Sequence, residues 1–582
     1  MMASTDAPPT ACRWRILATV IVVESVGGLM YAFGIYSARL KSKFSLSQQQ
    51  LDAISISSSL GSNVGVHWGL LTDAAGPSAA LCAALVAGGG GWLLLWSALG
   101  GVSGLRGLPW PYLCAFALLQ GTAMCGSDVA SMTTIAKAFP QNRGRATGLV
   151  KAMVGLSAAL AANVYVAAEP ALRLYVLLVA GAYVGACAFG AARLRAGDIL
   201  AAGARERPAD DAPRLAAILA RVVGLAVFYL ALQLANAFAP VPAAGRYATG
   251  ACAVLALVGG VVRPAAAAGA GGGRAAPLAA PLVAPAPKAP VRSATALEAY
   301  GSADFWLLWF VCFAVCGSGT VVMNNLTQIA KAAGIATRGA TVLVALLSIS
   351  NCLCRVAAGY ASDRTAERGV PRSALLAAVS VAMAGAHLLG LPASKGSVYV
   401  LSVLSGGAYG AVATVHPLVA ADRFGVGHLG AIYASITTAN GLGSYLGSNV
   451  LAARLYDAVN APGHQVCESS ARGTSCDCVG SRCFADTFLV CAALNGAAAL
   501  CCVVLARREA RRRTAGREEA GARVEAAAPR APSRAPYYPP VAPPSADAVD
   551  FARLASDDES DAEGGPGDGG LDDDATDDAS EA

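Results

Sequence analysis

Charged residues within the long apolar stretches of this sequence are candidates for function, because a charge is expensive there. The chief ones are Glu24, Asp128, Lys151 and Arg355. Glu24 would carry a proton, because burial in hydrocarbon favours the neutral form of a carboxyl group. The alternative is that Glu24 bonds to a neighbouring helix and only holds the two helices together.

The two bases are candidates for binding an anion. A buried guanidinium must be paired or bind an anion. Arg355 is therefore predicted to meet the negative group of a substrate, unless its long side chain reaches the membrane surface. Lys151 would be a second contact to that anion, a partner for Asp128, or a base that extends to the interface. Asp128 would have a structural rather than a substrate-binding role if it forms an ion pair with a base.

Neutral polar side chains extend this candidate substrate- and ion-binding set. An amide side chain within a span bonds either to a ligand or to another helix. Both interpretations are open for Asn63, Asn324 and Asn325. His416 precedes Pro417, so a backbone carbonyl freed by the proline could hold the imidazole, and this structural role competes with ligand binding.

The motifs of common enzymes and motors do not occur in the sequence. There is no Gly-x-x-x-x-Gly-Lys-Ser/Thr phosphate loop, no Ser/His/Asp signature and no metal-binding helix motif. We therefore expect a protein that is not an enzyme and that uses no cofactor, no metal ion and no nucleic-acid partner.

The elements that carry the candidate residues are predicted to be membrane helices. Of the 582 residues, 55% are hydrophobic and only 14% are charged, whereas about 25% of an average soluble protein is charged. The chain has too few polar groups to cover a soluble surface. Apolar runs of about 20 residues are long enough to cross a bilayer as helices.

Fourteen such runs predict an all-α membrane protein whose spans are arranged six, two, six. The runs are 14–37, 51–71, 79–99, 111–136, 145–167, 172–193, 216–238, 247–263, 303–324, 339–361, 373–391, 397–419, 428–450 and 484–506. The predicted parts are a six-helix bundle at 1–195, an extra helix pair at 196–263, an Ala/Pro/Gly-rich linker at 264–300, a second six-helix bundle at 301–506 and a disordered tail at 507–582.

The charge distribution predicts the orientation of the spans. Fourteen of the 37 acids and one base lie between Asp547 and Glu581, so this tail carries −13 and the rest of the chain +19. Bases concentrate in alternate loops, for example at Lys137, Arg143 and Arg145, and such loops stay in the cytosol. We expect a monomeric multi-pass protein with both termini cytosolic, in the plasma membrane or in a vacuolar or other organellar membrane.

A repeat relates the two groups of six spans. The second span ends with Gly69-Leu-Leu-Thr-Asp73-Ala-Ala-Gly76, and the matching later span ends with Gly359-Tyr-Ala-Ser-Asp363-Arg364. The two Gly-x-x-x-Asp segments are 290 residues apart, and a looser match between the fifth spans has nearly the same offset. This shared offset indicates an internal duplication, which is common in transporters.

These segments resemble the signature loop of the major facilitator superfamily. A closer similarity, to the nodulin-like family within it, is carried by Gly28-Leu-Met-Tyr31-Ala-Phe33-Gly34, by Phe139-Pro140-Gln-Asn-Arg143-Gly144, by Asn324-Asn325-Leu-Thr-Gln328-Ile329 and by Arg355-Val-Ala-Ala-Gly359. The resemblance extends from about residue 13 to about residue 506.

The resemblance implies two six-helix bundles that rock about a central site, with gating loops at Gly69, Asp73, Gly76, Gly359, Asp363 and Arg364. In the family pattern the glycine lets helices approach closely. The aspartate caps a neighbouring helix end or pairs with a base when the cytosolic side is closed. No base follows Asp73, whereas Arg364 follows Asp363. Arg355 resembles the substrate-binding arginine of monocarboxylate carriers, and Lys151 matches a lysine of the family.

Four cysteines cluster before the last predicted helix, at Cys467, Cys476, Cys478 and Cys483. The predicted topology places this loop outside the cytosol, where disulfides persist. We expect disulfide bonds there, although the sequence does not choose among the three possible pairings. A zinc site that also uses His464 is the alternative.

The sequence thus predicts a secondary active transporter that moves a small, monocarboxylate-like organic anion by alternating access, with a proton on Glu24 driving it. The choice of substrate rests on the two buried bases and on the family resemblance. One alternative is a transporter of an amino acid or another neutral solute, with the bases used only in ion pairs. Another is a membrane sensor or scaffold that uses the acidic tail to bind partners.

Overall fold

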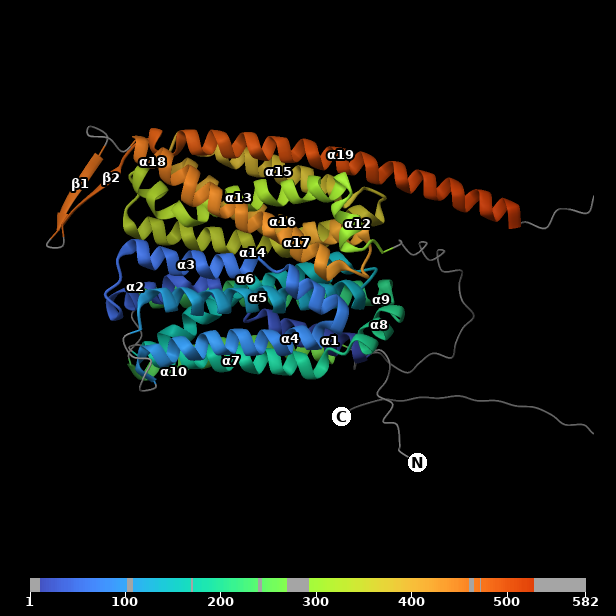
Figure 1. The fold of residues 1–582 in the computed structure, drawn as a ribbon, viewed down its shortest axis with the longest axis horizontal. Helices are drawn as coiled ribbons and strands as arrows, with labels where there is room; N and C mark the ends of the chain where they lie inside the picture. The colour runs from blue at the N-terminus through green and yellow to red at the C-terminus, as the bar shows by residue number, and fades with distance from the viewer. Residues whose placement is uncertain are drawn as a thin grey trace, which may run out of the picture. The chain divides into compact units, whose positions relative to one another are not determined.

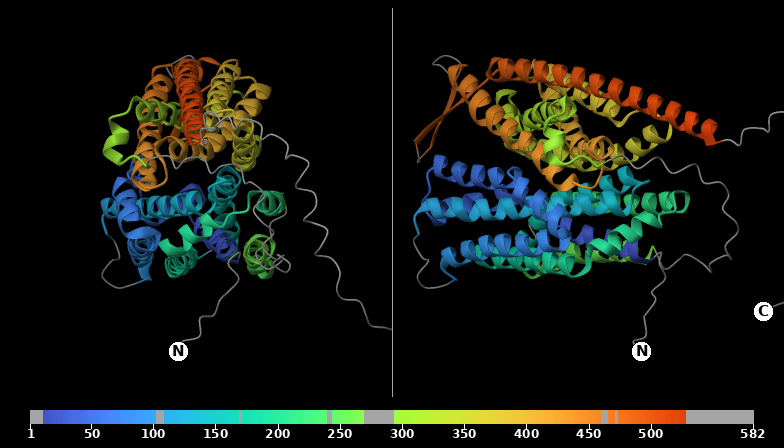
Figure 2. Two further views of the ribbon diagram at one scale, coloured as in Figure 1. Left: turned by 90° about the vertical axis from the view of Figure 1, so that its right-hand side faces the viewer. Right: turned by 45° about the vertical axis from the view of Figure 1, so that its right-hand side comes forward.

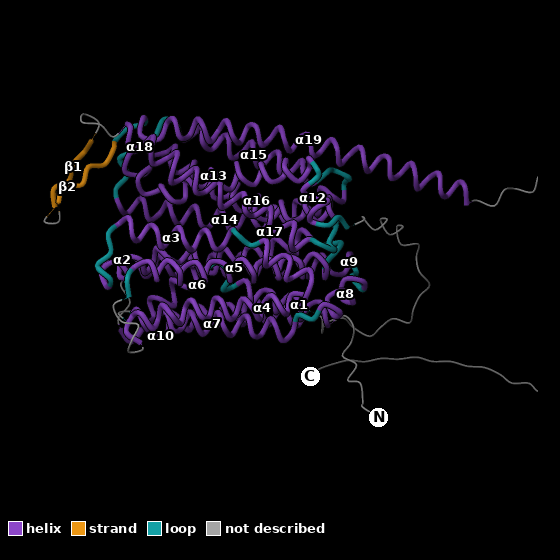
Figure 3. Tube along the Cα trace, viewed as in Figure 1, coloured by secondary structure: helices purple, strands orange, loops and turns teal. Residues whose placement is uncertain are grey.

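The computed structural model describes residues 11–101, 108–168, 171–238, 243–268, 293–459, 465–470 and 473–527, and most of them are helical (Figures 1 and 3). The helices are α1 Ala11–Glu24, α2 Phe33–Lys43, α3 Gln48–Asn63, α4 Val66–Trp96, α5 Trp110–Ala138, α6 Arg143–Ala168, α7 Leu172–Arg193, α8 Ala196–Ala204, α9 Pro208–Phe238, α10 Ala243–Leu257, α11 Arg263–Ala267, α12 Ala296–Tyr300, α13 Ala303–Ala332, α14 Thr337–Glu367, α15 Arg372–Gly390, α16 Lys395–Phe424, α17 Leu429–Ser444, α18 Ala453–Val459 and α19 Arg482–Ala527. Strands β1 Gln465–Ser470 and β2 Gly473–Cys478 form one antiparallel hairpin. The predicted all-α membrane fold is confirmed, with this hairpin as an addition.

Eleven helical stretches of the described residues are long and apolar enough to cross a membrane. The second and third predicted spans fall in one of them, Gln49–Gly100. The first and thirteenth predicted spans are outside the eleven. In the first, α1 and α2 are separate helices, and in the thirteenth a π-helical segment, Tyr445–Ala452, lies between α17 and α18. The count of fourteen spans therefore stays a prediction.

The continuous helix predicted over 14–37 is wrong, because the chain leaves α1 after Glu24 and turns before α2. Gly27 and Gly28 lie in this turn. Gly28 packs directly on α6: a Cβ added there would lie 2.2 Å from the Val154 carbonyl oxygen and 2.3 Å from the Ser157 hydroxyl oxygen. The break leaves Glu24 at the end of a helix rather than in the middle of one.

Gly76 separates the second span from the third inside α4. Its φ of 85° and ψ of 168° lie in a region that glycine adopts far more readily than other residues. Pro77 follows and begins the next helical stretch, as prolines do at helix starts. The kink places Asp73 near the end of the second span, next to the other half of the molecule.

Two groups of helices form the body of the protein. Helices from the N-terminal part (blue to green) gather on one side and those from the C-terminal part (yellow to red) on the other (Figures 1 and 2). We call them the N-half, α1–α7, and the C-half, α13–α19. The halves meet where α3 and α4 pack on α17, and where α6 packs on α14. These two contact zones contain Gly69 and Asp73 of the first predicted gating loop, and Gly359 and Asp363 of the second.

The inserted segment between the halves packs on the N-half. Helices α9 and α10 contact α6, and Arg13 of α1 forms a buried ion pair with Asp211 of α9 at 2.7 Å. Residues 269–292 of the predicted linker lie outside the described residues. At the C-terminal end, α19 continues past the predicted boundary at 506 as far as Ala527, so a helix covers part of the segment expected to be disordered.

Candidate substrate site and gates between the two halves

Asp128, Lys151 and Tyr433 form a triangle of hydrogen bonds between the halves. The Lys151 ammonium donates to Asp128 Oδ1 at 2.5 Å and to the Tyr433 hydroxyl at 2.8 Å. That hydroxyl donates to Asp128 Oδ2 at 2.6 Å. Lys151 and Asp128 belong to the N-half, whereas Tyr433 comes from α17 of the C-half. Of the roles open for Lys151, the structure therefore favours pairing with Asp128.

Arg355 is 2% exposed and lies where α14 meets α6. Its Nε donates to Asn351 Oδ1 and one terminal nitrogen to the Lys151 carbonyl oxygen, both at 2.8 Å. Both acceptors are neutral, and no acid among the described residues forms an ion pair with Arg355. A buried guanidinium without a counter-charge is unusual, because desolvation of the charge is not offset. This arginine can therefore receive an anion.

Glu24 is fully buried at the end of α1. Within the described part of the chain neither of its carboxylate oxygens has a hydrogen-bond partner, and the neighbouring Ser131 hydroxyl lies outside hydrogen-bonding geometry. The charges that act on it are Asp128, Lys151 and Arg355. The structure thus brings the four charged residues predicted from the sequence into one central cluster: Glu24, Asp128, Lys151 and Arg355.

His416 and Asn63 lie at the boundary between the halves. The His416 ring stacks on Tyr433 with centroids 5.4 Å apart, and its Nδ1 bonds to the Val412 carbonyl oxygen at 2.8 Å. The imidazole is thus held by a backbone carbonyl of its own helix, as in a structural role. The carbonyl that Pro417 frees is that of Ala413, four residues before it, so the acceptor differs from the one expected from the sequence. Asn63 Oδ1 accepts a hydrogen bond from Asn440 of α17 at 2.9 Å, so it joins helices of opposite halves.

Among the described residues, the hydrogen bonds of Asn324 and Asn325 do not reach the central cluster. Asn324 is exposed and donates to the Ser448 hydroxyl at 3.3 Å. Asn325 donates to the Val321 carbonyl oxygen of its own helix at 2.9 Å. Their sequence motif matched the family, but a motif does not determine which helix face carries a side chain.

The two aspartates of the repeat each cap a helix of the opposite half. Asp73 accepts hydrogen bonds from the backbone N–H groups of Gly430 at 3.0 Å and Ala431 at 2.7 Å, in the first turn of α17. Asp363 accepts from those of Gly144 and Arg145, both at 2.8 Å, in the first turn of α6. A carboxylate is favourable at a helix N-terminus because it meets free N–H groups and the positive end of the dipole.

The glycines of the repeat allow this close approach. A Cβ added to Gly69 would lie 2.3 Å from the Gly430 carbonyl oxygen, and one added to Gly359 would lie 2.4 Å from that of Gly144. Gly144 and Gly430 are 286 residues apart, close to the offset of the aspartates. We call the contacts of Asp73 with α17 the first gate and those of Asp363 with α6 the second gate.

The second gate is held by ion pairs that the first gate lacks among the described residues. Arg372 binds Asp363 at 2.8 Å and also contacts Asp422, and Arg143 binds Asp422 at 2.9 Å. Arg364, expected to be the base of this loop, instead lies exposed with Glu367 at 3.3 Å. The base that serves Asp363 was missed because it lies nine residues further along, at the start of α15.

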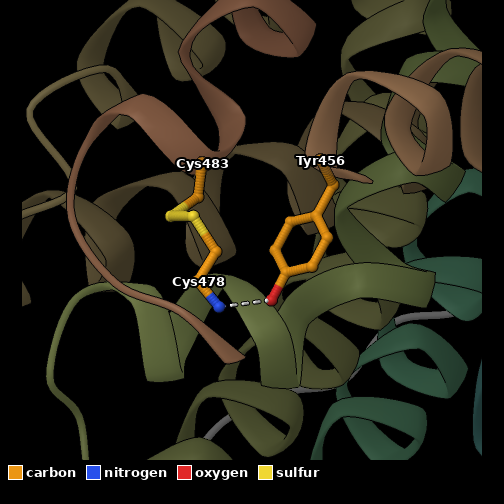
Figure 4. The surroundings of a disulfide bond; sticks show 3 residues. All are labelled: Tyr456, Cys478 and Cys483. Atoms are coloured by element: carbon orange, nitrogen blue, oxygen red, sulfur yellow. Dashed lines mark hydrogen bonds between the residues drawn. A yellow bond between two sulfur atoms is a disulfide. The ribbon is translucent and has the colours of Figure 1, made fainter. Parts of the chain in front are cut away.

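Cys478 and Cys483 are joined by a disulfide, and the Tyr456 hydroxyl accepts a hydrogen bond from the Cys478 backbone N–H at 3.0 Å (Figure 4). Cys467 and Cys476 are partners in the register of the hairpin, but their side chains lie outside the described residues, as does His464. Within the described residues, no group of three His, Cys, Asp or Glu side chains could hold a metal ion.

These features define a multi-pass integral membrane protein built from two related halves, with a buried charged cluster where the halves meet. The family model "Nodulin-like" matches residues 13–264, and the model "NFD4, C-terminal domain" matches residues 299–513. The chain is a nodulin-like member of the major facilitator superfamily.

Two similar proteins match shorter stretches. Protein NUCLEAR FUSION DEFECTIVE 4 of Arabidopsis thaliana is 29% identical over 167 residues, which is 28% of each chain. Probable transporter MCH1 of Yarrowia lipolytica is 26% identical over 208 residues, covering 34% of this chain and 40% of that protein. The match thus spans less than half of either relative.

Solved structures with a similar arrangement include two sugar symporters. The proton:xylose symporter XylE, bound to 6-bromo-6-deoxy-D-glucose, is 14% identical with a TM-score of 0.49, covering 84% of this chain and 94% of its own. The Escherichia coli fucose:proton symporter FucP (N162A) is 12% identical with a TM-score of 0.47, covering 84% and 98%.

Proposed function

We propose that this protein is a secondary active transporter that carries a small organic anion, of the monocarboxylate type, across the membrane by alternating access. The observation that carries the proposal is Arg355, a buried guanidinium whose hydrogen bonds go to neutral oxygens. A carboxylate fits such a group because the planar fork of the guanidinium matches two carboxylate oxygens.

The central cluster offers a means of coupling the anion to a proton. With all four side chains ionised, Glu24 and Asp128 balance Lys151 and Arg355. Asp128 and Lys151 neutralise each other through the triangle, which leaves Glu24 to balance Arg355 over a longer distance. A proton on Glu24 would leave one positive charge in excess, and a monovalent anion would then restore neutrality. This predicts one proton carried with each monovalent anion.

In the proposed cycle, the contacts at the two gates correspond to a state that is closed toward the cytosol. Both gates lie at the ends of α6 and α17 that the charge distribution predicts to be cytosolic, and the hydrogen bonds of both are formed. Release of the substrate to the cytosol would require Asp73 to leave α17, Asp363 to leave α6, and the Tyr433 hydroxyl to leave Asp128 and Lys151. Each of these contacts joins opposite halves, so one rocking motion would break them all.

A solute-uptake panel with the purified full-length chain in proteoliposomes tests this function. The panel would contain monocarboxylates, dicarboxylates, neutral amino acids and sugars, each with and without an inward proton gradient and at a clamped membrane potential. We expect uptake of a monocarboxylate that rises with the proton gradient and does not respond to the potential. Uptake of neutral solutes alone would support the alternative substrate class, and no uptake of any solute would favour the sensor or scaffold.

A further inference from the structure

The loop before α6 is held by a second carboxylate besides Asp363. Glu206, between α8 and α9, accepts hydrogen bonds from the backbone N–H of Gln141 at 2.6 Å and from that of Asn142 at 2.9 Å. Asp363 binds the N–H groups of Gly144 and Arg145. The two carboxylates therefore share no donor, and Glu206 does not compete with the gate.

A chain of side chains leads from Glu206 to the C-half. The Asn142 amide nitrogen donates to Glu206 Oε1 at 3.0 Å, and the Asn142 amide oxygen accepts from Arg145 at 2.7 Å. Arg145 in turn donates to Glu367 of α14 at 3.0 Å. Glu206 thus fixes the orientation of Asn142, Asn142 fixes Arg145, and Arg145 makes a contact between the halves.

Arg13 fixes the position of Glu206 itself. One terminal nitrogen of Arg13 donates to the Arg205 carbonyl oxygen at 2.5 Å, and the other binds Asp211 at 2.7 Å. Arg13 is 2% exposed and Asp211 is fully buried. Since these anchors lie on either side of Glu206 in the sequence, the inserted segment presents that carboxylate to α6 in a defined place.

The loop before α17 is held in an equivalent way. The Ser293 hydroxyl accepts a hydrogen bond from the Gly427 backbone N–H at 3.1 Å, and the next residue, Ala294, donates its N–H to the Phe424 carbonyl oxygen at 2.8 Å. Gly427 lies 286 residues after Gln141, which is the same offset that relates Gly430 to Gly144. The contact is close, since a Cβ added to Gly425 would lie 2.7 Å from the Ser293 hydroxyl oxygen.

We infer that Glu206 and Ser293 are positioning residues for the two gates, and that each fixes the loop whose helix supplies N–H donors to the gate aspartate of the other half. Both residues belong to the part of the chain that connects the halves: Glu206 precedes the inserted helix pair and Ser293 precedes the C-half. The connection between the halves therefore sets how firmly the gates close. This inference rests on the proposed alternating-access cycle.

Amide hydrogen exchange of the purified full-length chain in lipid nanodiscs tests the inference without any solute, so the identity of the substrate does not affect it. The variants are Glu206→Ala and Ser293→Ala. We expect exchange at Gly144 and Arg145 to rise about three- to tenfold in Glu206→Ala, and exchange at Gly430 and Ala431 to rise similarly in Ser293→Ala, as expected for the loss of one or two hydrogen bonds.

Two substitutions in the same segments serve as controls. Asp210→Asn removes an exposed acid four residues after Glu206, and Thr295→Ala removes the hydroxyl that caps α12, two residues after Ser293. Both should leave exchange at the gates unchanged. Exchange that rises at Gln141, Asn142 and Gly427 but not at the four gate amides would overturn the inference. If Glu206→Ala does not fold, amide exchange is measured in Glu206→Gln instead. The same amides then support or overturn the inference.

Discussion

The hydroxyl of Tyr433 lies 2.8 Å from the Lys151 ammonium, and these two residues come from opposite halves of the protein. The same hydroxyl donates to Asp128, so a single oxygen of the C-half closes a triangle whose two charges belong to the N-half. The ion pair would stay satisfied in its own half if the halves separated in the proposed cycle. Tyr433 thus adds a contact that can form and break during a rocking cycle without leaving a charge unpaired.

Tyr433→Phe is predicted to weaken the closed state and lower the transport rate. The substitution keeps the ring that stacks on His416 but removes the hydroxyl from the triangle. We expect the loss of about 1–3 kcal/mol of stability, as is typical of hydrogen bonds to charged groups, seen as a lower midpoint of thermal unfolding.

Tyr229→Phe is the matched control for this experiment. The Tyr229 hydroxyl donates to the Ala253 carbonyl oxygen at 2.7 Å within the inserted helix pair, away from the boundary of the halves. Its loss should lower stability but leave transport unchanged. Equal transport by the Tyr433 and Tyr229 variants would contradict the role given to the triangle.

The Asp128–Lys151 pair is predicted to show strong coupling in a double-mutant cycle. Lys151→Met should destabilise the protein by about 1–3 kcal/mol, because it leaves the Asp128 carboxylate, whose side chain is 21% exposed, without its counter-charge. Asp128→Asn in the same chain should recover much of that loss. Additive effects of the two substitutions in thermal unfolding would show that the residues are not paired in the membrane.

Part of this arrangement was predictable from the sequence. A carboxylate and an ammonium on neighbouring spans must find partners in hydrocarbon, so the pairing of Asp128 with Lys151 was among the predicted possibilities. Tyr433 was missed because a tyrosine in an apolar span is usually part of the core. The available signal was its place one turn after Gly430, in the segment that already matched the fifth span.

Other features depend on geometry that a single sequence does not contain. The repeat of glycine and aspartate identified Asp73 and Asp363, but their acceptance of N–H groups from α17 and α6 follows from packing between distant segments. Glu206 and Ser293 lie in connecting segments with no recognisable motif. Asn324 and Asn325 matched a family motif, yet the rotation of α13 directs their hydrogen bonds to Ser448 and to their own helix.

The two gates are predicted to differ in strength. Asp363→Asn removes the carboxylate that Arg372 and Arg145 share, while Arg372 keeps Asp422 and Arg145 keeps Glu367, so it should cost about 3 kcal/mol. Asp73→Asn removes the charge and one of the two hydrogen bonds to backbone, because an amide has a single acceptor oxygen, which should cost about 1–2 kcal/mol. Thermal unfolding of the two variants side by side measures the difference, and an equal loss would show that the ion pairs of the second gate contribute nothing.

Glu24→Gln is predicted to uncouple transport from protons. The amide is neutral at every pH, so the central cluster would keep one positive charge in excess and bind the anion without a proton. We expect exchange of labelled for unlabelled substrate to continue, while uptake driven by a proton gradient falls at least tenfold. Full retention of the gradient dependence would exclude Glu24 as the proton carrier.

Arg355 provides the most direct test of anion transport. Uptake of each carboxylate in the panel would be measured in proteoliposomes that contain the native chain, Arg355→Gln, or Arg221→Gln, which removes an exposed guanidinium of α9. We predict that Arg355→Gln lowers carboxylate uptake at least tenfold at equal protein content and fold stability, while Arg221→Gln transports normally. Unchanged uptake of every carboxylate by the Arg355 variant would contradict the proposed substrate class.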